Sequence, residues 1–265
     1  MAQRITETET RRMALLIDGD NAQPSLIGKI LTEASKYGTI TIRRIYGDWT
    51  TSNMGGWKNT LNNHAIQPIQ QFRYTIGKNA TDSAMIIDAM DVLHSHLVDG
   101  FCIVSSDSDY TRLATRIREM GIFVMGIGKK KTPKAFVNAC NIFIYTENLE
   151  PQPQPHEARR GQGGRREHKK AEVHEHGERA EREERDKDLD PVPLIKGAYE
   201  MAMEENGWAN LASMGFYLRQ LDPSFDPRTY GYKQLSQLIR AHANLFDLRV
   251  EEAGGKNAIW LKSKE

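Results

Sequence analysis

The segment MALLIDGDNA (13–22) decides the fold class of the first half of the chain. Its first six residues form an apolar run that ends in an aspartate, which is typical of a strand buried on both faces. Similar runs occur in FCIVSSD (101–107) and IFVMGIG (122–128), and segments with helical periodicity separate them. Because strands that alternate with helices form parallel sheets, an α/β domain with helices on both faces is predicted.

The other elements of this half follow the same alternation. Further strands are predicted at 39–47, 66–72 and 141–145. Helices are predicted from Pro24 to Gly38, around 57–63, after Thr81 as the N-cap, over 110–120 and from Pro133. The helix after Thr81 holds so many apolar residues that we expect it to be largely buried.

Aspartates follow two of the buried strands and open one helix: Asp18 and Asp20 after the first strand, Asp107 and Asp109 after the strand at 101–107, and Asp82 at the helix start. Sites in parallel sheets lie at the carboxyl ends of the strands, so these acids converge if the two strands are neighbours. Clustered carboxylates need raised pKa values or a cation, and oxygen ligands favour Mg²⁺ or Mn²⁺. Each acid alone is also explained as a turn or cap residue, Asp20 and Asp109 above all.

Other side chains are expected at the same edge of the sheet. The residues predicted to hydrogen-bond the ligands or a bound water, or otherwise to serve as turn and strand-end polar groups, are Asn21, Ser105 and Ser106. Asp88, six residues after Asp82 and off its helix face, is predicted to support the site from behind the ligands or to be a structural acid. The cations predicted to hold RNA phosphates, or otherwise to be solvated, are Lys78, Lys129, Lys130 and Lys131. Tyr46, Trp49 and Trp57 flank Gly-rich turns and are candidates to stack on bases, with core packing favoured for Trp57.

Residues 151–190 have a composition that separates two domains. They contain 10 Lys or Arg, 11 Asp or Glu and only 5 apolar residues, too few to offset the entropy of ordering. A disordered linker is therefore predicted there, a disordered N-terminus at 1–12, and folded domains at 13–150 and 191–265. The net charge of +1 excludes a protein that is basic overall and coats nucleic acid non-specifically.

The last segment has the pattern of a winged helix. Helices are predicted at 192–206, 211–221 and 229–242, and strands at 246–252 and 257–263 are joined by the hairpin signal AGGK. Such modules dock a helix on nucleic acid or contact proteins.

Four motifs of the first domain resemble the NYN domain, a PIN-like ribonuclease fold: LLIDGDNA, GKNATDSAMIIDAM, VSSDSDY and the GIG strand end. The resemblance covers about 13–147 and implies a PIN-like three-layer α/β/α sandwich that cleaves RNA with metal ions. By motif, it implies that the catalytic and metal-binding acids are Asp18, Asp82, Asp107 and Asp109. Asn21 matches the Asn of the first motif, and Asp88 matches a second acid on the helix.

Residues 192–263 resemble the OST-HTH/LOTUS family, chiefly through the Asp-Pro turn and the segment YGYKQLSQLI. The family implies RNA binding or, in some members, docking of an RNA helicase. The candidate RNA contacts are Tyr232, Lys233, Gln237 and Arg240, with Tyr230 either a further contact or a core residue.

The sequence therefore predicts a metal-dependent ribonuclease, with endo- and exonuclease action both open, Mg²⁺ or Mn²⁺ as cofactor and RNA as partner. The alternative is a non-catalytic RNA-binding or adaptor protein with the same folds, and a protein partner of the C-terminal domain is also open. A phosphatase with an Asp nucleophile in DGDN is disfavoured, because Ala22 stands where a Thr or Val is needed. No membrane span or leader is recognised, so a cytoplasmic protein is expected.

Overall fold

The computed structural model describes residues 10–72, 80–150, 190–253 and 256–264. Residues up to Glu150 belong to one compact unit, and most of the later residues belong to another. The predicted linker except Asp190, most of the predicted disordered N-terminus, and Lys78 with its loop lie outside the described residues.

The first unit is built on a six-stranded sheet in which every strand pair is parallel. The strand order is β3-β2-β1-β4-β5-β6, so the first and fourth strands are neighbours, which is the condition under which the acids after them converge. The strands are β1 (Arg12–Asp18), β2 (Thr39–Gly47), β3 (Gln67–Gln70), β4 (Gly100–Val104), β5 (Phe123–Gly128) and β6 (Ile142–Tyr145).

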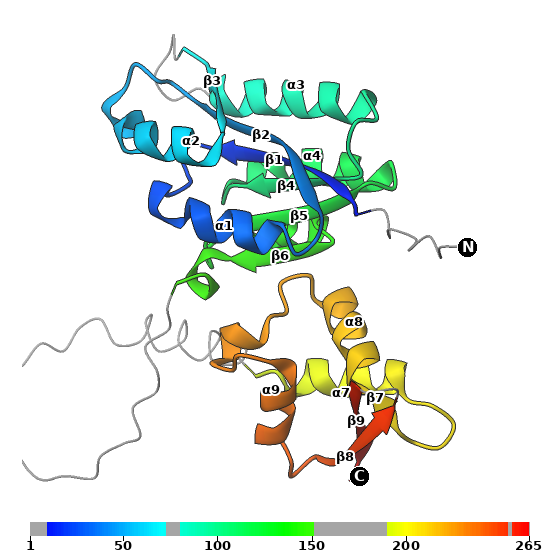
Figure 1. The fold of residues 1–265 in the computed structure, drawn as a ribbon. Helices are drawn as coiled ribbons and strands as arrows, with labels where there is room; N and C mark the ends of the chain where they lie inside the picture. Colours follow the sequence, from blue (N-terminus) through cyan, green and yellow to red (C-terminus); the bar gives the residue numbers. More distant parts are fainter. Residues whose placement is uncertain (1–9, 73–79, 151–189, 254–255, 265) are drawn as a thin grey trace, which may run out of the picture. The chain divides into compact units, whose positions relative to one another are not determined.

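Helices cover both faces of this sheet (Figure 1). One face packs against α3 (Ala80–His94), α4 (Thr111–Glu119) and α5 (Lys134–Ala139). The other packs against η1 (Pro24–Leu26), α1 (Ile27–Ala34) and η2 (Ser52–Trp57), which continues into α2 (Lys58–His64). Short 3₁₀ turns η3 (Ser108–Tyr110) and η4 (Thr146–Asn148) follow β4 and β6.

The central strand contributes to two separate cores. Ala14 and Leu16 pack on the α3 face, whereas Met13, Leu15 and Ile17 pack on the α1 face, and all five are fully buried. This two-sided burial explains the continuous apolar run that the sequence shows. The prediction of a three-layer α/β/α sandwich is confirmed.

Helix α3 differs from its prediction in two ways. It begins at Ala80, so Thr81 lies inside the first turn, and its buried hydroxyl has no hydrogen-bond partner among the described residues. The predicted Thr81 cap is therefore wrong. The helix is also buried on one side only, because Ile87 is 64% exposed. The expectation of a largely buried helix, drawn from its apolar composition, is therefore wrong.

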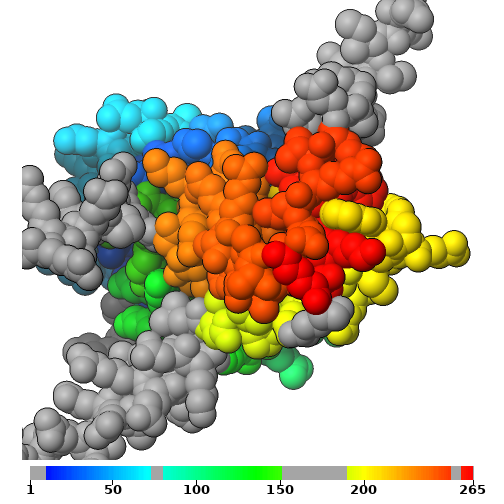
Figure 2. All heavy atoms as spheres, turned by 90° about the horizontal axis from the view of Figure 1, so that it is seen from below, coloured from blue at the N-terminus to red at the C-terminus, as the bar shows by residue number. Residues whose placement is uncertain are grey.

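The C-terminal domain combines helices with a three-stranded antiparallel sheet of order β7-β9-β8. Its elements are α7 (Val192–Ala202), β7 (Ala209–Asn210), α8 (Leu211–Leu221), η5 (Pro227–Tyr230), α9 (Leu235–Ala241), β8 (Phe246–Ala253) and β9 (Lys256–Ser263). The helices with a β8–β9 hairpin are the predicted winged-helix arrangement. Figure 2 shows residues of η5 and α9, in orange, at the surface of this domain.

The third helix of this domain is shorter than predicted. Gly231 has a φ of +84°, a left-handed conformation that interrupts the helix between η5 and α9. Within the described ranges, no helix combines the length and apolarity that crossing a bilayer requires.

Candidate active site

The candidate site lies where β1 and β4 run side by side and the chain leaves them toward opposite faces. After β1 the chain enters α1 on one face, and after β4 it enters η3 and α4 on the other. Such a switch point opens a crevice at the carboxyl ends of the two strands. Asp18 is the last residue of β1, and Ser105 directly follows β4.

Asp18 is fully buried, and the protein holds both of its carboxylate oxygens. Oδ2 accepts hydrogen bonds from Asn21 Nδ2 at 2.7 Å and from Ser105 Oγ at 2.8 Å. Oδ1 accepts from the backbone N–H of Asp20 at 3.1 Å and of Asn21 at 3.3 Å. Burial raises the pKa of this carboxyl, the hydrogen bonds oppose the rise, and the charge of Asp82 adds to it.

Asp82 enters the crevice from the first turn of α3. Its Oδ1 accepts a hydrogen bond from the phenol of Tyr110 at 2.7 Å. Partial burial raises the pKa of this carboxyl, the Tyr110 bond lowers it, and the negative charges of Asp107 and Asp109 raise it again. These acids therefore act on one another electrostatically, as expected if they share one crevice.

Asp107 is the N-cap of η3. Its Oδ1 accepts from the backbone N–H of Asp109 at 2.9 Å, while its own N–H donates to Ser105 Oγ at 3.1 Å. The capping role considered for Asp109 thus belongs to Asp107, and Asp109 itself is exposed. An oxygen of Asp107 remains outside these bonds.

The donors in the crevice fit a hard divalent cation in chemistry. All are carboxylate oxygens, and their mutual repulsion is what a bound cation would relieve. As the side chains stand, however, no three Asp, Glu, His or Cys residues of the described ranges are grouped closely enough to hold a metal ion. The acids that could hold one after side-chain adjustment are Asp18, Asp82, Asp107 and Asp109.

The hydrogen-bond partners of Asp88 among the described residues lie on β2 and not among the acids of the crevice. Arg44 Nη1 of β2 donates to its Oδ1 at 2.5 Å, and the phenol of Tyr46 donates to its Oδ2. No hydrogen bond within the described residues joins it to the acids of the crevice. Asp88 fastens α3 to β2, and so it supports Asp82 through the helix that carries both.

The structure corrects the expectations for the aromatic side chains. Tyr46 and Trp57 are 0% and 1% exposed, so they are core residues and cannot stack on bases. Trp49 is half-buried, and its indole N–H donates to the carbonyl of Ile69 at 3.0 Å. The core packing favoured for Trp57 is therefore confirmed, and the base stacking expected of Tyr46 is wrong.

The candidate cations occupy two places. At the end of β5, the backbone N–H of Lys129 donates to Ser106 Oγ at 2.8 Å, and that of Lys130 donates to the Glu147 carboxylate at 3.0 and 3.1 Å. The side chains of Lys130 and Lys131 are exposed. In the C-terminal domain, Tyr232 is half-buried and Lys233 and Arg240 are exposed, with Gln237 Oε1 accepting from the Lys233 N–H at 3.0 Å.

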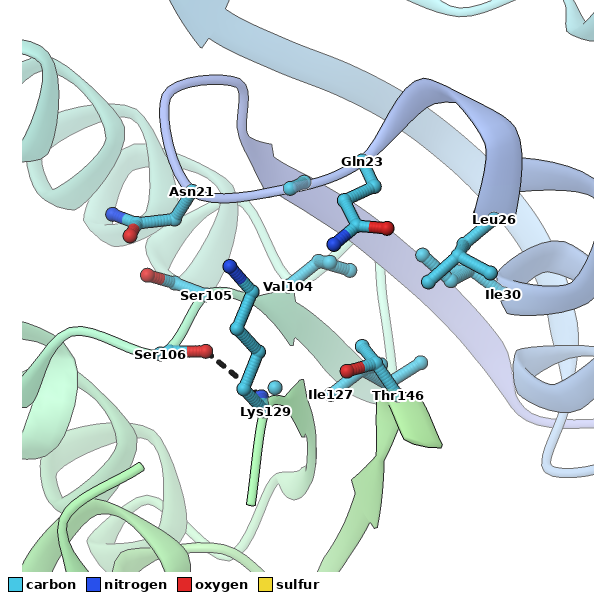
Figure 3. Close-up of a pocket in the computed structure, with 12 residues that line it drawn as sticks. Asn21, Gln23, Leu26, Ile30, Val104, Ser105, Ser106, Ile127, Lys129 and Thr146 are labelled. Atoms are coloured by element: carbon cyan, nitrogen blue, oxygen red, sulfur yellow. Dashed lines mark hydrogen bonds between the residues drawn. The ribbon is translucent and has the colours of Figure 1, made fainter. Parts of the chain in front are cut away.

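A small pocket adjoins Asp18 on the α1 side of the sheet edge (Figure 3). Asn21 and Ser105, which bind the Asp18 carboxylate, are part of its wall. Its other polar lining comes from Gln23, Ser106, Lys129 and Thr146, and its apolar lining from Leu26, Ile30, Val104 and Ile127.

Tyr110 is the residue of this site that sequence reasoning missed. It is fully buried and packs near Phe136, yet its hydroxyl reaches Asp82. The available signal was its position directly after SSDSD, where a phenol rather than a purely apolar ring begins the helix. Its contact with Asp82 spans 28 residues and depends on how α3 docks.

Comparison with protein-family models matches residues 12–149 to the NYN domain and residues 187–258 to the OST-HTH/LOTUS domain. No curated protein matches the chain.

Three solved structures show limited similarity. A Vibrio parahaemolyticus protein of unknown function has 15% identity, with 52% of this chain and 94% of that chain covered and a TM-score of 0.44. An uncharacterised Nitrosomonas europaea protein has 29% identity, coverage of 43% and 93%, and a TM-score of 0.26. Acinetobacter baumannii MurG has 15% identity, coverage of 54% and 43%, and a TM-score of 0.33.

Proposed function

The chain belongs to the NYN domain family, a family of PIN-like nucleases, and from this premise we propose that it is a divalent-metal-dependent ribonuclease. The observation that carries the proposal is the electrostatic coupling of Asp82 with Asp18, Asp107 and Asp109 at the switch point between β1 and β4. A structural cap or turn needs no such gathering of like charges, whereas a cation site does.

The proposed metal-holding acids are Asp18, Asp82, Asp107 and Asp109. Asn21 and Ser105 keep the Asp18 carboxylate in one orientation, and the Tyr110 phenol fixes Oδ1 of Asp82. The hydrogen bonds to Oδ1 of Asp82 and Oδ1 of Asp107 hold these two side chains in place. The second carboxylate oxygen of each is then available to a ligand. When bound, Mg²⁺ or Mn²⁺ supplies an activated water and neutralises the charge that develops on the phosphodiester.

The C-terminal domain is proposed to hold the RNA substrate. Its family match places it among OST-HTH/LOTUS domains. Lys233 and Arg240 are exposed near α9 and offer cations to phosphates, and Tyr232 precedes the same helix. Docking of a protein on this surface remains the alternative role.

A non-catalytic RNA-binding function is the second candidate. The observation that favours it is that the described acids, as they stand, form no group able to hold a metal ion. Both oxygens of Asp18 are also already engaged by protein donors. Under this reading the chain binds RNA and leaves it intact with any divalent ion.

The test is cleavage of a pool of labelled single-stranded RNAs with Mn²⁺, Mg²⁺ or EDTA. Asp107→Asn is the informative variant, because asparagine keeps the oxygen that caps η3 and removes only the charge. We expect the variant to lose at least the roughly 10- to 100-fold that loss of an outer partner of a metal ligand costs. Full activity of Asp107→Asn, or RNA binding by the wild type without cleavage, would reject the nuclease assignment.

A further inference from the structure

We propose that the pocket beside Asp18 is a subsite for one backbone phosphate of the RNA strand, with Lys129 as its cation. The pocket lies on the α1 side of the sheet edge, whereas Asp82 enters from the α3 side. This inference deepens the proposed function and rests on it for the identity of the ligand. It assigns Lys129 a role that its neighbours Lys130 and Lys131 do not share, because neither lines the pocket.

The size of the pocket decides between a phosphate and a base. Its free volume is about 10 Å³, which is roughly what one water molecule occupies in a cavity. A nucleobase cannot enter a space of this size. One phosphate oxygen can, with the rest of the phosphodiester lying across the opening.

Lys129 supplies a cation to the opening, which suits an anion. Lys129 is half-buried, and its ammonium makes no ion pair with a carboxylate of the described residues. Figure 3 shows its side chain running from the end of β5 toward the loop that carries Asn21 and Gln23. Apolar side chains form part of the pocket wall and lower the local dielectric, which strengthens the attraction of the ammonium for an anion.

Ser106 adds a neutral donor to the same opening. Its Oγ accepts the hydrogen bond from the Lys129 N–H at 2.8 Å, so its own proton is available to a phosphate oxygen (Figure 3). The same bond ties the loop after β5 to the loop after β4, which fixes the base of the Lys129 side chain. The donors are therefore held in place before any ligand arrives.

The position of the pocket sets the direction of the RNA strand. Asn21 and Ser105 separate it from the Asp18 carboxylate, each bound to Oδ2 within 2.8 Å. A strand that has one phosphate at the acids would place a neighbouring phosphate on the α1 side. The RNA is then expected to cross the edge of the sheet from the α3 side to the α1 side.

The first test is the salt dependence of binding to a ten-nucleotide oligouridine by the full chain in EDTA. Each phosphate contact on a single strand contributes about 0.7 to the slope of log K against log salt. Lys129→Gln should lower the slope by about 0.7, and Lys129→Arg should restore it. Lys29→Gln is the matched control, since Lys29 is an exposed α1 residue outside the pocket.

The second test fixes the register of the contact. Oligouridines with a single neutral methylphosphonate at successive positions are cut with Mn²⁺. In the wild type, cleavage should fall at the phosphodiester that lies a fixed number of nucleotides from the methylphosphonate. In Lys129→Gln, the position of the methylphosphonate should no longer affect cleavage in this way.

The outcomes separate the subsite from the proposed function. Equal salt slopes for Lys129→Gln and Lys29→Gln, or cleavage by the wild type with no position-dependent loss, would overturn the subsite while leaving the ribonuclease intact. Absence of cleavage with a lower slope for Lys129→Gln alone would retain the phosphate subsite in an RNA-binding protein.

Discussion

The two acids on either side of the crevice differ in how many partners hold them. Asp18 accepts four hydrogen bonds and is fully buried, whereas Asp82 accepts one and is half-buried. Replacing either carboxylate by an amide therefore has opposite consequences, although both substitutions remove one negative charge from the crevice.

Asp18→Asn should lower the stability of the metal-free protein, and Asp82→Asn should raise it slightly. The new amide at 18 turns an N–H₂ toward donors, which costs about 1–3 kcal/mol for a buried group. At 82 the amide oxygen still accepts from Tyr110, and the repulsion from Asp107 and Asp109 disappears. Because solvent screens this half-exposed group, the gain should stay below about 1 kcal/mol. Urea denaturation in EDTA measures the free energy of unfolding of both variants. A change of the same sign in the two variants would contradict the argument.

Tyr110→Phe should weaken Mn²⁺ binding roughly 10- to 100-fold, as loss of a hydrogen bond to a metal ligand does. The phenol is the described donor to Asp82, and phenylalanine keeps the buried ring in place. Electron paramagnetic resonance of free Mn²⁺ measures the affinity. Asp82→Ala should make the Tyr110→Phe substitution silent in a double-mutant cycle, and an unchanged Tyr110 effect in that background would show that the ring acts only by packing.

Whether the contacts of these residues could be predicted depends on whether local sequence or the packing of distant elements sets them. Asp18, Asn21 and Ser105 were expected at the carboxyl ends of two parallel strands, but their meeting depended on β1 and β4 being neighbours, which the structure shows. The Tyr110–Asp82 bond and the Arg44–Asp88–Tyr46 cluster were not expected, because they depend on how α3 packs over the sheet. No local pattern encodes that packing.

At the scale of elements, β1 is fixed at its start as well as at its carboxyl end. Asp99, just before β4, accepts from the Arg12 N–H at 2.8 Å and from its guanidinium at 3.0 and 3.1 Å. These bonds lower the pKa of Asp99 to about 2. They align the neighbouring strands β1 and β4, whose far ends carry the acids of the crevice.

Asp99→Asn should lower the urea midpoint at pH 6, and the difference from the wild type should shrink as the pH falls from about 4 toward about 2. A carboxyl with a depressed folded pKa stabilises the fold above its unfolded pKa and loses that contribution when it is protonated. Asp91→Asn serves as the control, because Asp91 is exposed and has no side-chain hydrogen bond among the described residues. A difference that stays constant with pH would show that the charge of Asp99 is irrelevant.

Element boundaries were predictable where local chemistry sets them. Gly121, with a φ of +75°, follows α4 as expected. The two-residue strand β7 was not foreseen, because it exists only through its pairing of Ala209 and Asn210 with Leu261 and Trp260. The break between η5 and α9 falls at Gly231, a residue that the helical pattern had passed over.

At the scale of the whole molecule, the chain joins two domains with separate interiors. Both cores around the six-stranded sheet are built from residues 13–149. The C-terminal domain buries its own set, which includes Ile195, Leu238 and Phe246. The proposed cleavage and the proposed RNA holding therefore fall to parts of the chain with separate cores.

A chain that ends at residue 150 should still cut short RNA with Mn²⁺ but bind long RNA more weakly. The acids, Tyr110 and the Lys129 pocket all lie before that point, and so do both cores that position them. If the C-terminal domain holds RNA as proposed, the tether gives the bound RNA an effective concentration of about mM at the first domain, and truncation removes this gain. Cleavage rates on a ten-nucleotide and a hundred-nucleotide RNA test this, with Lys233→Glu in the full chain as a matched control for RNA holding. Unchanged affinity for the long RNA after truncation would instead assign the C-terminal domain to a protein partner, and loss of cleavage of the short RNA would place part of the active site beyond residue 150.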